Sequence, residues 1–507
     1  MPSVATRIRR FIGNPNPGET LFLAIVAALV IRQVYWVFTG YLNPDEFENL
    51  QIVWLLERGV WPYRDYIHTH LPLHNLLLWP IYRIHGPSAE LPGLVRIHAF
   101  PLTLLLAAQI GWVAHRLANR RTAAWLAIIV FLASPAIGKK LAEVRPDTFA
   151  YPCWLAAIAA FVSFTESKGE SRSSFFLCAA ALGIGLLFSQ KGVLLVPALA
   201  IGFESQMAHF SRPPWKGRFW RHLAFAAIVA APTALALGAI FALGIMRPGD
   251  LDLLLTGGLH DTSRDFFDQH RTLVLTNGAL ASIAAFGVGF LGIVRARLWK
   301  GAKNWETKVG IQALAFIGLV SLGQFAAQSV MFYHVLILPV AVFSVLAARE
   351  LARMRLWTVL AVILVAIASP WVTTWDQEIL VGNHRREQVD RFQFVLDRVP
   401  EDRYVLDMLS SLGTFHPIPH RFLHFRPMMI GILNDMGETD AWIRALDEGR
   451  VGAVADFDWL NKFAPAAIVS RVERSFAPSA EFPSVMLPVV EVGASAPGSG
   501  DSAAPMP

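Results

Sequence analysis

Charged residues and cysteines are both scarce in this chain, and each shortage excludes a class of protein. Asp, Glu, Lys and Arg make up 16% of the 507 residues, whereas a soluble domain carries roughly 25%. With 54% hydrophobic residues, the chain needs the apolar solvent that a lipid bilayer supplies. The two cysteines, Cys153 and Cys178, fall in different apolar segments, so they predict neither a disulfide framework nor a zinc site.

The net charge of +6 does not indicate a nucleic-acid partner. A nucleic-acid-binding protein gathers its cations on one face. Here they form short clusters between apolar segments, as in the cytoplasmic loops of a membrane protein. We therefore expect membrane lipid, and no nucleic acid, as a partner.

Eleven apolar segments are predicted to span the membrane. They lie near residues 20–40, 92–115, 122–138, 148–165, 174–190, 192–207, 222–246, 273–294, 309–327, 330–348 and 356–375. Alternating these spans places six cationic clusters on one side, which the positive-inside rule assigns to the cytoplasm. The clusters are Arg7/Arg9/Arg10, Arg116/Arg120/Arg121, Lys168/Arg172, Arg212/Lys216/Arg218/Arg221, Arg295/Arg297/Lys300/Lys303/Lys308 and Arg349/Arg353/Arg355. No small-residue cleavage site follows the first apolar run, so we expect an uncleaved signal anchor.

The outer side then receives residues 41–91, 139–147, 247–271 and everything after about 376. The apolar run Leu71–Ile84 is too short to span and is predicted as an interfacial helix on this side. Residues 376–492 are predicted as a small soluble α/β domain, with a helix over 385–399 and strands at Tyr404–Leu409 and Ala466–Val469. Residues 493–507 are rich in Ala, Ser, Gly and Pro and are predicted to be disordered. The expected fold is thus an all-α polytopic membrane domain over 1–375, followed by this extracytoplasmic domain.

The first outer loop concentrates titratable side chains. Asp45 and Glu46 follow the first span, and Asp65, His68 and His70 come later in the loop. A solvated loop would tolerate such charges, but this one is also rich in Trp, Tyr and Leu. Those residues favour packing against the membrane, where carboxylates suit a general base or a metal site.

The other candidate residues lie at span boundaries on the same side. Asp147 is either a helix N-terminal acid favoured by the dipole or a functional carboxylate. Lys191 interrupts a long apolar stretch, so it either reaches to the outer surface or binds a phosphate. Arg145 lies in the same outer loop as Asp147, and weaker candidates are His270, Arg271, Tyr333 and His334.

Residues Gly287–Gly292 match a dinucleotide-binding fingerprint, Gly-x-Gly-x-x-Gly. The motif lies inside a predicted span and has no soluble strand before it, so close helix packing explains it better.

Several short motifs occur in a characteristic order. An Asp-Glu pair follows the first span, then a Gly-x-x-Pro-Tyr stretch at Gly59–Tyr63 and a His-x-Pro-Leu stretch at His70–Leu73. An Arg-x-x-x-x-Pro span at Arg96–Pro101, the external Pro146-Asp147 and the buried Lys191-Gly192 come after it. This order resembles the GT-C fold membrane glycosyltransferases, especially the branch of protein O-mannosyltransferases and the lipid A aminoarabinose transferase. The resemblance is strongest over residues 41–195.

The resemblance implies roles for individual residues. The catalytic acid corresponds to Asp45, with Glu46 beside it, and the second-loop acid corresponds to Asp147. The lysine associated with the lipid phosphate corresponds to Lys191, and Tyr333-His334 resembles a segment of the last spans. Relatives often carry an acid or a lysine near Pro-Pro-Leu, where this chain has His68-Thr69-His70. A divalent metal ion (Mg, Mn or Zn) therefore stays open as a cofactor, and no other cofactor is expected.

An outer-face site would receive its sugar through the bilayer as a polyprenyl-phosphate donor, because nucleotide sugars stay in the cytoplasm. We expect Asp45 to act as base, and Lys191, Arg145 and Arg271 to stabilise the leaving phosphate, with inversion of the anomeric centre. The acceptor would be a glycolipid, a polysaccharide or a protein at the outer face of the inner membrane.

Two alternatives remain. The first is a transporter or flippase of a lipid-linked substrate, which would favour polar groups near mid-bilayer on broken helices. The second is a membrane-anchored assembly protein whose C-terminal domain is the active part.

Overall fold

The structure is a computed structural model. It describes residues 17–66, 71, 73–210, 215–246, 282–298, 305–327, 336–372, 384–407, 412–419 and 438–489. The chain divides into two compact units, Met1–Gln393 and Phe394–Pro507. Each unit is described by itself.

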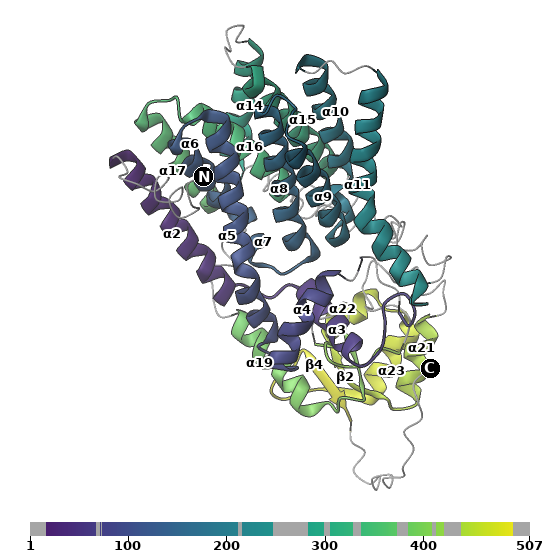
Figure 1. Ribbon diagram of the computed structural model, residues 1–507. Coiled ribbons are helices and arrows are strands. Elements are labelled where there is room, and N and C mark those ends of the chain that lie inside the picture. Colours follow the sequence, from purple (N-terminus) through teal and green to yellow (C-terminus); the bar gives the residue numbers. More distant parts are fainter. Residues whose placement is uncertain are drawn as a thin grey trace. The chain divides into compact units, whose positions relative to one another are not determined.

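Helices make up the first unit in its described part (Figure 1). They are α2 (Pro17–Thr39), α3 (Pro44–Glu57), α4 (Leu73–His85), α5 (Leu91–Ala118), α6 (Arg121–Ala133), α7 (Pro135–Ala142), α8 (Pro146–Glu166), α9 (Arg172–Phe188), the 3-10 turn η1 (Gln190–Leu194), α10 (Leu195–Phe210), α11 (Trp215–Ala242), α14 (Ile283–Leu298), α15 (Trp305–Ala327), α16 (Ile337–Leu351) and α17 (Leu356–Val372). Helix α19 (His384–Arg398) continues from this unit into the second.

Within the described residues, each of the eleven predicted spans overlaps a helix. Four helices, α2, α5, α8 and α11, are long and apolar enough to cross a membrane, and five shorter apolar helices accompany them among the described residues. The total of eleven crossings stays a prediction. The predicted interfacial helix over 71–84 is present as α4.

The predicted span 122–138 consists of two helices. Helix α6 ends at Ala133, and Ser134 is extended before Pro135 opens α7. A proline lacks the backbone N–H that would continue the helix, and it pushes the preceding residue out of the helical region. The first outer loop also contains a helix that was not predicted, α3. Asn43 caps it, and Glu46 completes a capping box.

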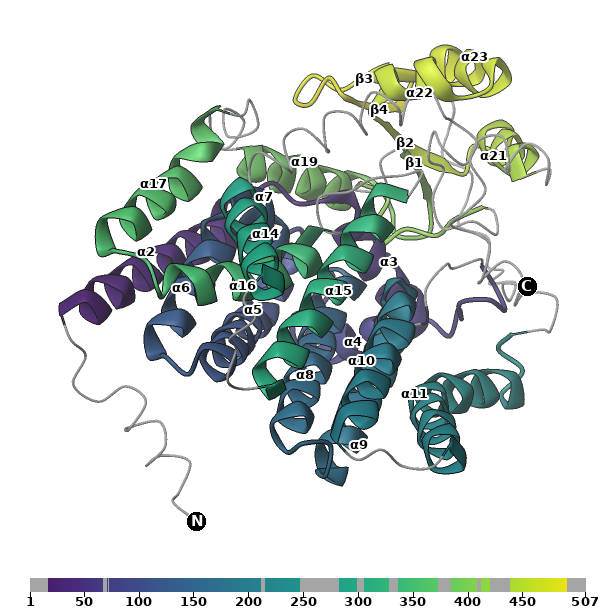
Figure 2. The ribbon, with the colours of Figure 1, turned by 90° about the horizontal axis from the view of Figure 1, so that it is seen from above.

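Glycines set the closest helix contacts. Added Cβ atoms at Gly289 and Gly292 in α14 would lie 2.8 Å from Phe343 Cδ1 and 3.0 Å from Glu350 Cγ of α16. Close packing therefore explains Gly289 and Gly292, as predicted, whereas nothing lies within 4 Å of a Cβ at Gly287. Every residue of α16 is buried, and the helix lies inside the bundle next to α14 and α15 (Figure 2).

The second unit holds a small mixed sheet. Its strands are β1 (Tyr404–Asp407), β2 (Val451–Ala455), β3 (Phe476–Pro478) and β4 (Val485–Pro488), in the order β1-β2-β4-β3. Strands β1 and β2 are parallel, whereas β4 pairs antiparallel with both β2 and β3. Its other helices are α21 (Glu438–Asp447), α22 (Phe457–Phe463) and α23 (Ala466–Ser475).

The α/β character of the C-terminal part and its first helix and strand are confirmed. The predicted strand at Ala466–Val469 is wrong, because these residues open α23. Ile468, Val469 and Val472 are its buried residues, and that spacing marks one face of a helix. The predicted disordered tail, 493–507, lies outside the described residues.

Gly183 offers a test of the helix packing. A Cβ there would lie 2.5 Å from the backbone oxygen of Val229 on α11, so Gly183→Ala must push α9 and α11 apart. We expect a loss of about 1–3 kcal/mol in stability, seen as a lower thermal midpoint in detergent. Gly238→Ala on α11 is the control, since nothing lies within 4 Å of its Cβ position. Equal midpoints for the two variants would contradict this packing.

Candidate active site

A buried ion pair anchors the start of α3. Arg96 of α5 and Glu46 of α3 are 1% and 2% exposed, and Arg96 Nε donates to Glu46 Oε1 at 2.7 Å. The same guanidinium donates to the backbone oxygens of Gly40 and Tyr41 at 2.8 and 2.7 Å. Glu46 also accepts from the backbone N–H of Val144 at 2.9 Å. One ion pair thus connects the segment after α2, helices α3 and α5, and the loop before α8.

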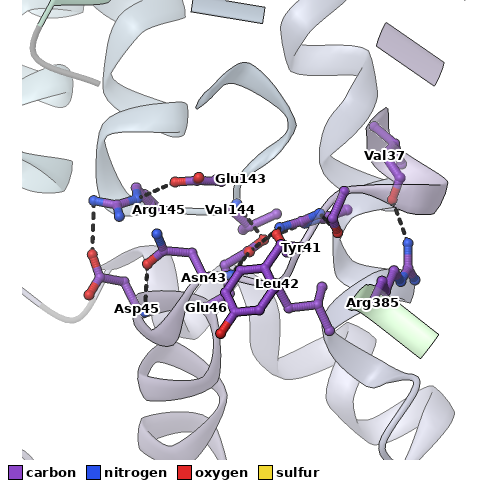
Figure 3. A network of polar contacts seen from close by, with 12 residues as sticks. Val37, Tyr41, Leu42, Asn43, Asp45, Glu46, Glu143, Val144, Arg145 and Arg385 are labelled. Atoms are coloured by element: carbon purple, nitrogen blue, oxygen red, sulfur yellow. Dashed lines mark hydrogen bonds and ion pairs between the residues drawn. The ribbon is translucent and has the colours of Figure 1, made fainter. Parts of the chain in front are cut away.

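Asp45 lies beside Glu46 but faces a different partner. Arg145 Nη1 lies 2.8 Å from Asp45 Oδ2 (Figure 3). Arg145 also donates from Nε to Glu143 at 2.9 Å, and Lys140 Nζ lies 2.5 Å from the other oxygen of Glu143. The Arg145 side chain is 8% exposed, whereas that of Asp45 is 31% exposed. Asp45 is therefore the carboxylate of this group that a substrate can reach from outside.

Neighbouring charges keep Glu143 and Arg145 ionised. Burial alone would raise the pKa of Glu143, but Lys140 and Arg145 outweigh it and hold that pKa below its ordinary value. Burial alone would lower the pKa of Arg145, but the negative charges of Asp45, Glu143 and Asp147 raise it above its ordinary value. Both side chains are charged at neutral pH.

A second ion pair joins Asp147 and Lys191. Asp147 lies in the first turn of α8, and its Oδ2 is 2.7 Å from Lys191 Nζ on η1. Asp147 is buried, whereas the Lys191 side chain is 32% exposed. A Cβ at Gly192 would lie 2.4 Å from the Trp154 ring, so the turn that carries Lys191 packs closely against α8. Asp147 is thus both a helix N-terminal acid and the partner of the lysine.

We call this group the polar corner. It consists of Asp45, Glu46, Arg96, Lys140, Glu143, Arg145, Asp147 and Lys191. Its four acids and four cations balance formally. In addition to Glu46, four residues that were predicted for the site meet here, although the sequence separates them widely. They are Asp45, Arg145, Asp147 and Lys191. Arg96, Lys140 and Glu143 were not predicted as site residues. Of these, Arg96 was noted only as part of the Arg-x-x-x-x-Pro motif.

Asp65 has a local structural role. Its Oδ2 accepts from the backbone N–H of Trp61 at 2.6 Å, and Arg64 Nε donates to Oδ1 at 2.9 Å. Burial raises the pKa of Asp65, but these two hydrogen bonds outweigh burial and lower it. Asp65 therefore holds the turn over residues 61–65, and its substrate or metal role stays a prediction.

The remaining predicted site residues lie outside the described residues. They are His68, His70, His270, Arg271, Tyr333 and His334. Within the part of the chain that the structure describes, no three His, Cys, Asp or Glu side chains come together as a metal site. A divalent metal ion stays a prediction.

Part of the chain matches a known protein family. Residues 69–246 match the family described as dolichyl-phosphate-mannose-protein mannosyltransferase. This segment contains Arg145, Asp147 and Lys191, and it begins after Asp45. No curated protein matches the sequence.

Solved structures show the same fold. ArnT from Cupriavidus metallidurans bound to undecaprenyl phosphate matches with a TM-score of 0.62 and 13% identity, over 93% of this chain and 98% of that one. The oligosaccharyltransferase AglB from Archaeoglobus fulgidus, in complex with an inhibitory peptide and a dolichol-phosphate, matches with a TM-score of 0.54 and 12% identity. That match covers 93% of this chain and 74% of AglB.

The match over residues 69–246 relates that part of the chain to a glycosyltransferase family, and the fold resembles that of ArnT. The resemblance drawn from the short motifs is confirmed.

The Glu46–Arg96 pair can be tested against an exposed pair on the same helix. Glu46→Gln leaves the Arg96 guanidinium buried without its counter-charge, so we expect a loss of about 3–5 kcal/mol in stability. Glu57→Gln is the control, because Glu57 and its partner Arg83 are 31% and 61% exposed. Its loss should stay below about 1 kcal/mol. Unfolding in detergent measures both, and a Glu46→Gln variant as stable as Glu57→Gln would contradict the anchoring role.

Proposed function

We propose that this protein transfers a sugar from a polyprenyl-phosphate donor to a hydroxyl of a glycolipid, glycan or protein acceptor at the outer face of the inner membrane. The observation that carries the proposal is the polar corner. It presents one accessible carboxylate, Asp45, and one accessible ammonium, Lys191, each paired with a buried partner of opposite charge. Transfer to a hydroxyl from a lipid phosphate needs one base and one cation.

The similar structures support the class of donor. ArnT is bound to undecaprenyl phosphate and AglB is in complex with a dolichol-phosphate. Both ligands are polyprenyl-type lipids that carry a phosphate. The proposed donor shares this chemistry and reaches the site through the bilayer.

The arrangement of helix ends supports an outer-face site. Helix α5 carries Arg96 near its N-terminus and Arg116 in its last turn, and 28 residues of helix measure about 42 Å. Arg116 pairs with Glu166 at the end of α8, whose first turn carries Asp147. The polar corner and the Arg116/Arg120/Arg121 cluster therefore lie at opposite ends of the same two helices, as the positive-inside assignment requires.

In the proposed step, Asp45 removes the proton from the acceptor hydroxyl. The acceptor oxygen bonds to the anomeric carbon as the bond from that carbon to the phosphate oxygen breaks, and the electron pair leaves with the phosphate. A single in-line attack inverts the anomeric centre. Lys191 and Arg145 stabilise the departing phosphate, which needs no protonating acid. Asp45 then releases its proton to water.

The other acids position these groups. Glu143 holds Arg145 from the side opposite Asp45, and Asp147 holds Lys191. Because an ammonium has three N–H donors, Lys191 can keep Asp147 and still donate to a phosphate. Glu46 holds the first turn of α3, and with it Asp45, against α5.

Asp45→Asn should abolish transfer while the protein stays folded. The side chain is 31% exposed, so little packing is lost, and removal of a general base costs about 10²–10⁴-fold in rate. Mass spectrometry of surface glycolipids and glycoproteins, with and without the wild-type protein, identifies the product. Cells that carry Asp45→Asn should lack that product, and cells that carry Glu57→Gln should make it. Near wild-type product from Asp45→Asn would remove Asp45 from the mechanism.

Lys191→Ala should weaken donor binding and leave acceptor dependence unchanged. The variant loses a charge-assisted contact to phosphate worth about 1.5–3 kcal/mol, which is about 10- to 100-fold in affinity. Lys191→Arg should restore part of the loss. Initial rates in nanodiscs, with donor and acceptor varied separately, measure the effect. A change confined to acceptor dependence would show that Lys191 is not the phosphate ligand.

A further inference from the structure

A second charged cluster lies at the other end of the first unit from the polar corner. Glu350, near the end of α16, is 1% exposed. Its Oε1 lies 2.7 Å from Arg349 Nη1 and 3.4 Å from Arg353 Nη1, and its Oε2 lies 3.7 Å from Arg295 Nη1 of α14. We call these four residues the Glu350 cluster.

The position of α14 shows at which end of the helices the Glu350 cluster lies. Ser282, just before α14, lies within hydrogen-bond distance of Ser134, with 3.2 Å between the hydroxyl oxygens. Ser134 precedes α7, which carries Lys140 of the polar corner. Arg295 follows near the far end of α14, about 20 Å along the helix. The Glu350 cluster is therefore on the side that the positive-inside rule assigns to the cytoplasm.

Close helix packing builds the cluster. A Cβ at Gly292 would lie 3.0 Å from Glu350 Cγ and 3.2 Å from the backbone oxygen of Leu346. Glycine at this position lets α14 lie directly against α16. Arg295 is three residues further along α14, on the same helix face, and so reaches the Glu350 carboxylate.

The positive charges in this cluster exceed the negative ones. Three guanidiniums meet one carboxylate, and Arg120 Nη1 adds a fourth by donating to the backbone oxygen of Ala352 at 2.7 Å. The C-termini of α14 and α16 each contribute about half a negative charge. Among these described groups, the four guanidiniums exceed the negative charge of Glu350 and the two helix ends by about two. Arg295 and Arg353 are 52% and 35% exposed, so an anion can reach them from outside.

Exposed apolar side chains lie close to these arginines in the sequence. Val294 of α14 is 51% exposed, and Leu356 and Trp357 at the start of α17 are 44% and 81% exposed. Helix α14 contacts both α16 and α17. An exposed tryptophan next to arginines is typical of the membrane–water interface. A lipid presents the matching combination, a phosphate next to acyl chains.

We propose that the Glu350 cluster binds the phosphodiester headgroup of an anionic membrane lipid on the side opposite the polar corner. Arg295 and Arg353 contact the phosphate, and the acyl chains lie against Val294, Leu356 and Trp357. Guanidinium groups suit this ligand because their N–H donors match phosphate oxygens in pairs. The site is independent of the sugar-transfer reaction.

The test uses the purified full-length protein in nanodiscs or mixed micelles that contain phosphatidylglycerol or phosphatidylcholine. Native mass spectrometry and thermal midpoints measure lipid binding. Phosphatidylglycerol should stay bound to the wild-type protein and raise its midpoint, whereas phosphatidylcholine should not. Arg295→Gln should weaken phosphatidylglycerol binding about 5-fold, and Arg295→Gln with Arg353→Gln about 30-fold.

Arg116→Gln is the matched control, because it removes one arginine at the same end that pairs with a single acid, Glu166. Its lipid binding should equal that of the wild type. Arg295 is half-exposed and its contact with Glu350 is long, at 3.7 Å, so Arg295→Gln should fold normally. The single variant therefore tests the proposal even if the double variant does not fold. Unchanged phosphatidylglycerol binding by Arg295→Gln would overturn the proposal, as would equal weakening in Arg116→Gln. If inorganic phosphate raised the thermal midpoint as much as phosphatidylglycerol does, the ligand would be a soluble anion and the lipid proposal would be overturned.

Discussion

The buried pair of Arg96 and Glu46 is the constraint on which the polar corner depends. A buried guanidinium and a buried carboxylate are each costly alone, so each requires the other in place. Arg96 also satisfies two backbone oxygens after α2, and Glu46 satisfies backbone N–H groups at the start of α3 and before α8. Three segments far apart in the sequence are thereby fixed to one another. Asp45 and Arg145, adjacent to these anchor points, take their positions from them.

The sequence predicted the helices of the first unit well, because a bilayer imposes a simple rule. Each span needs an apolar run of about 20 residues, and the cationic clusters mark the ends. The prediction failed where local backbone chemistry outweighs hydropathy. Pro135 divides one apolar run into two helices, and the Asn43 cap starts α3 inside a segment read as a loop. Ala466–Val469 was read as a strand because four residues cannot distinguish a period of 2 from one of 3.6.

The site was predictable in part. Asp45, Asp147 and Lys191 were found because a charged side chain beside an apolar segment has a high free-energy cost, which indicates a functional or structural role. The pairing of Asp147 with Lys191 and of Asp45 with Arg145 could not be read from the sequence, because it depends on how helices pack. Glu143 and Lys140 were overlooked for the same reason. Their importance lies in the contacts they make with Arg145 and with each other.

The formal neutrality of the polar corner has a consequence for turnover. In the proposed reaction, the donor is a phosphodiester with one negative charge, whereas the lipid product is a phosphomonoester whose second ionisation lies near neutral pH. The anion therefore gains charge as the sugar leaves, while the protein charges around it stay the same. Lys191 and Arg145 would hold the spent lipid more tightly than the fresh donor. In that reaction, release of the product lipid would limit turnover, and accumulated polyprenyl phosphate would compete with the donor for the same cations.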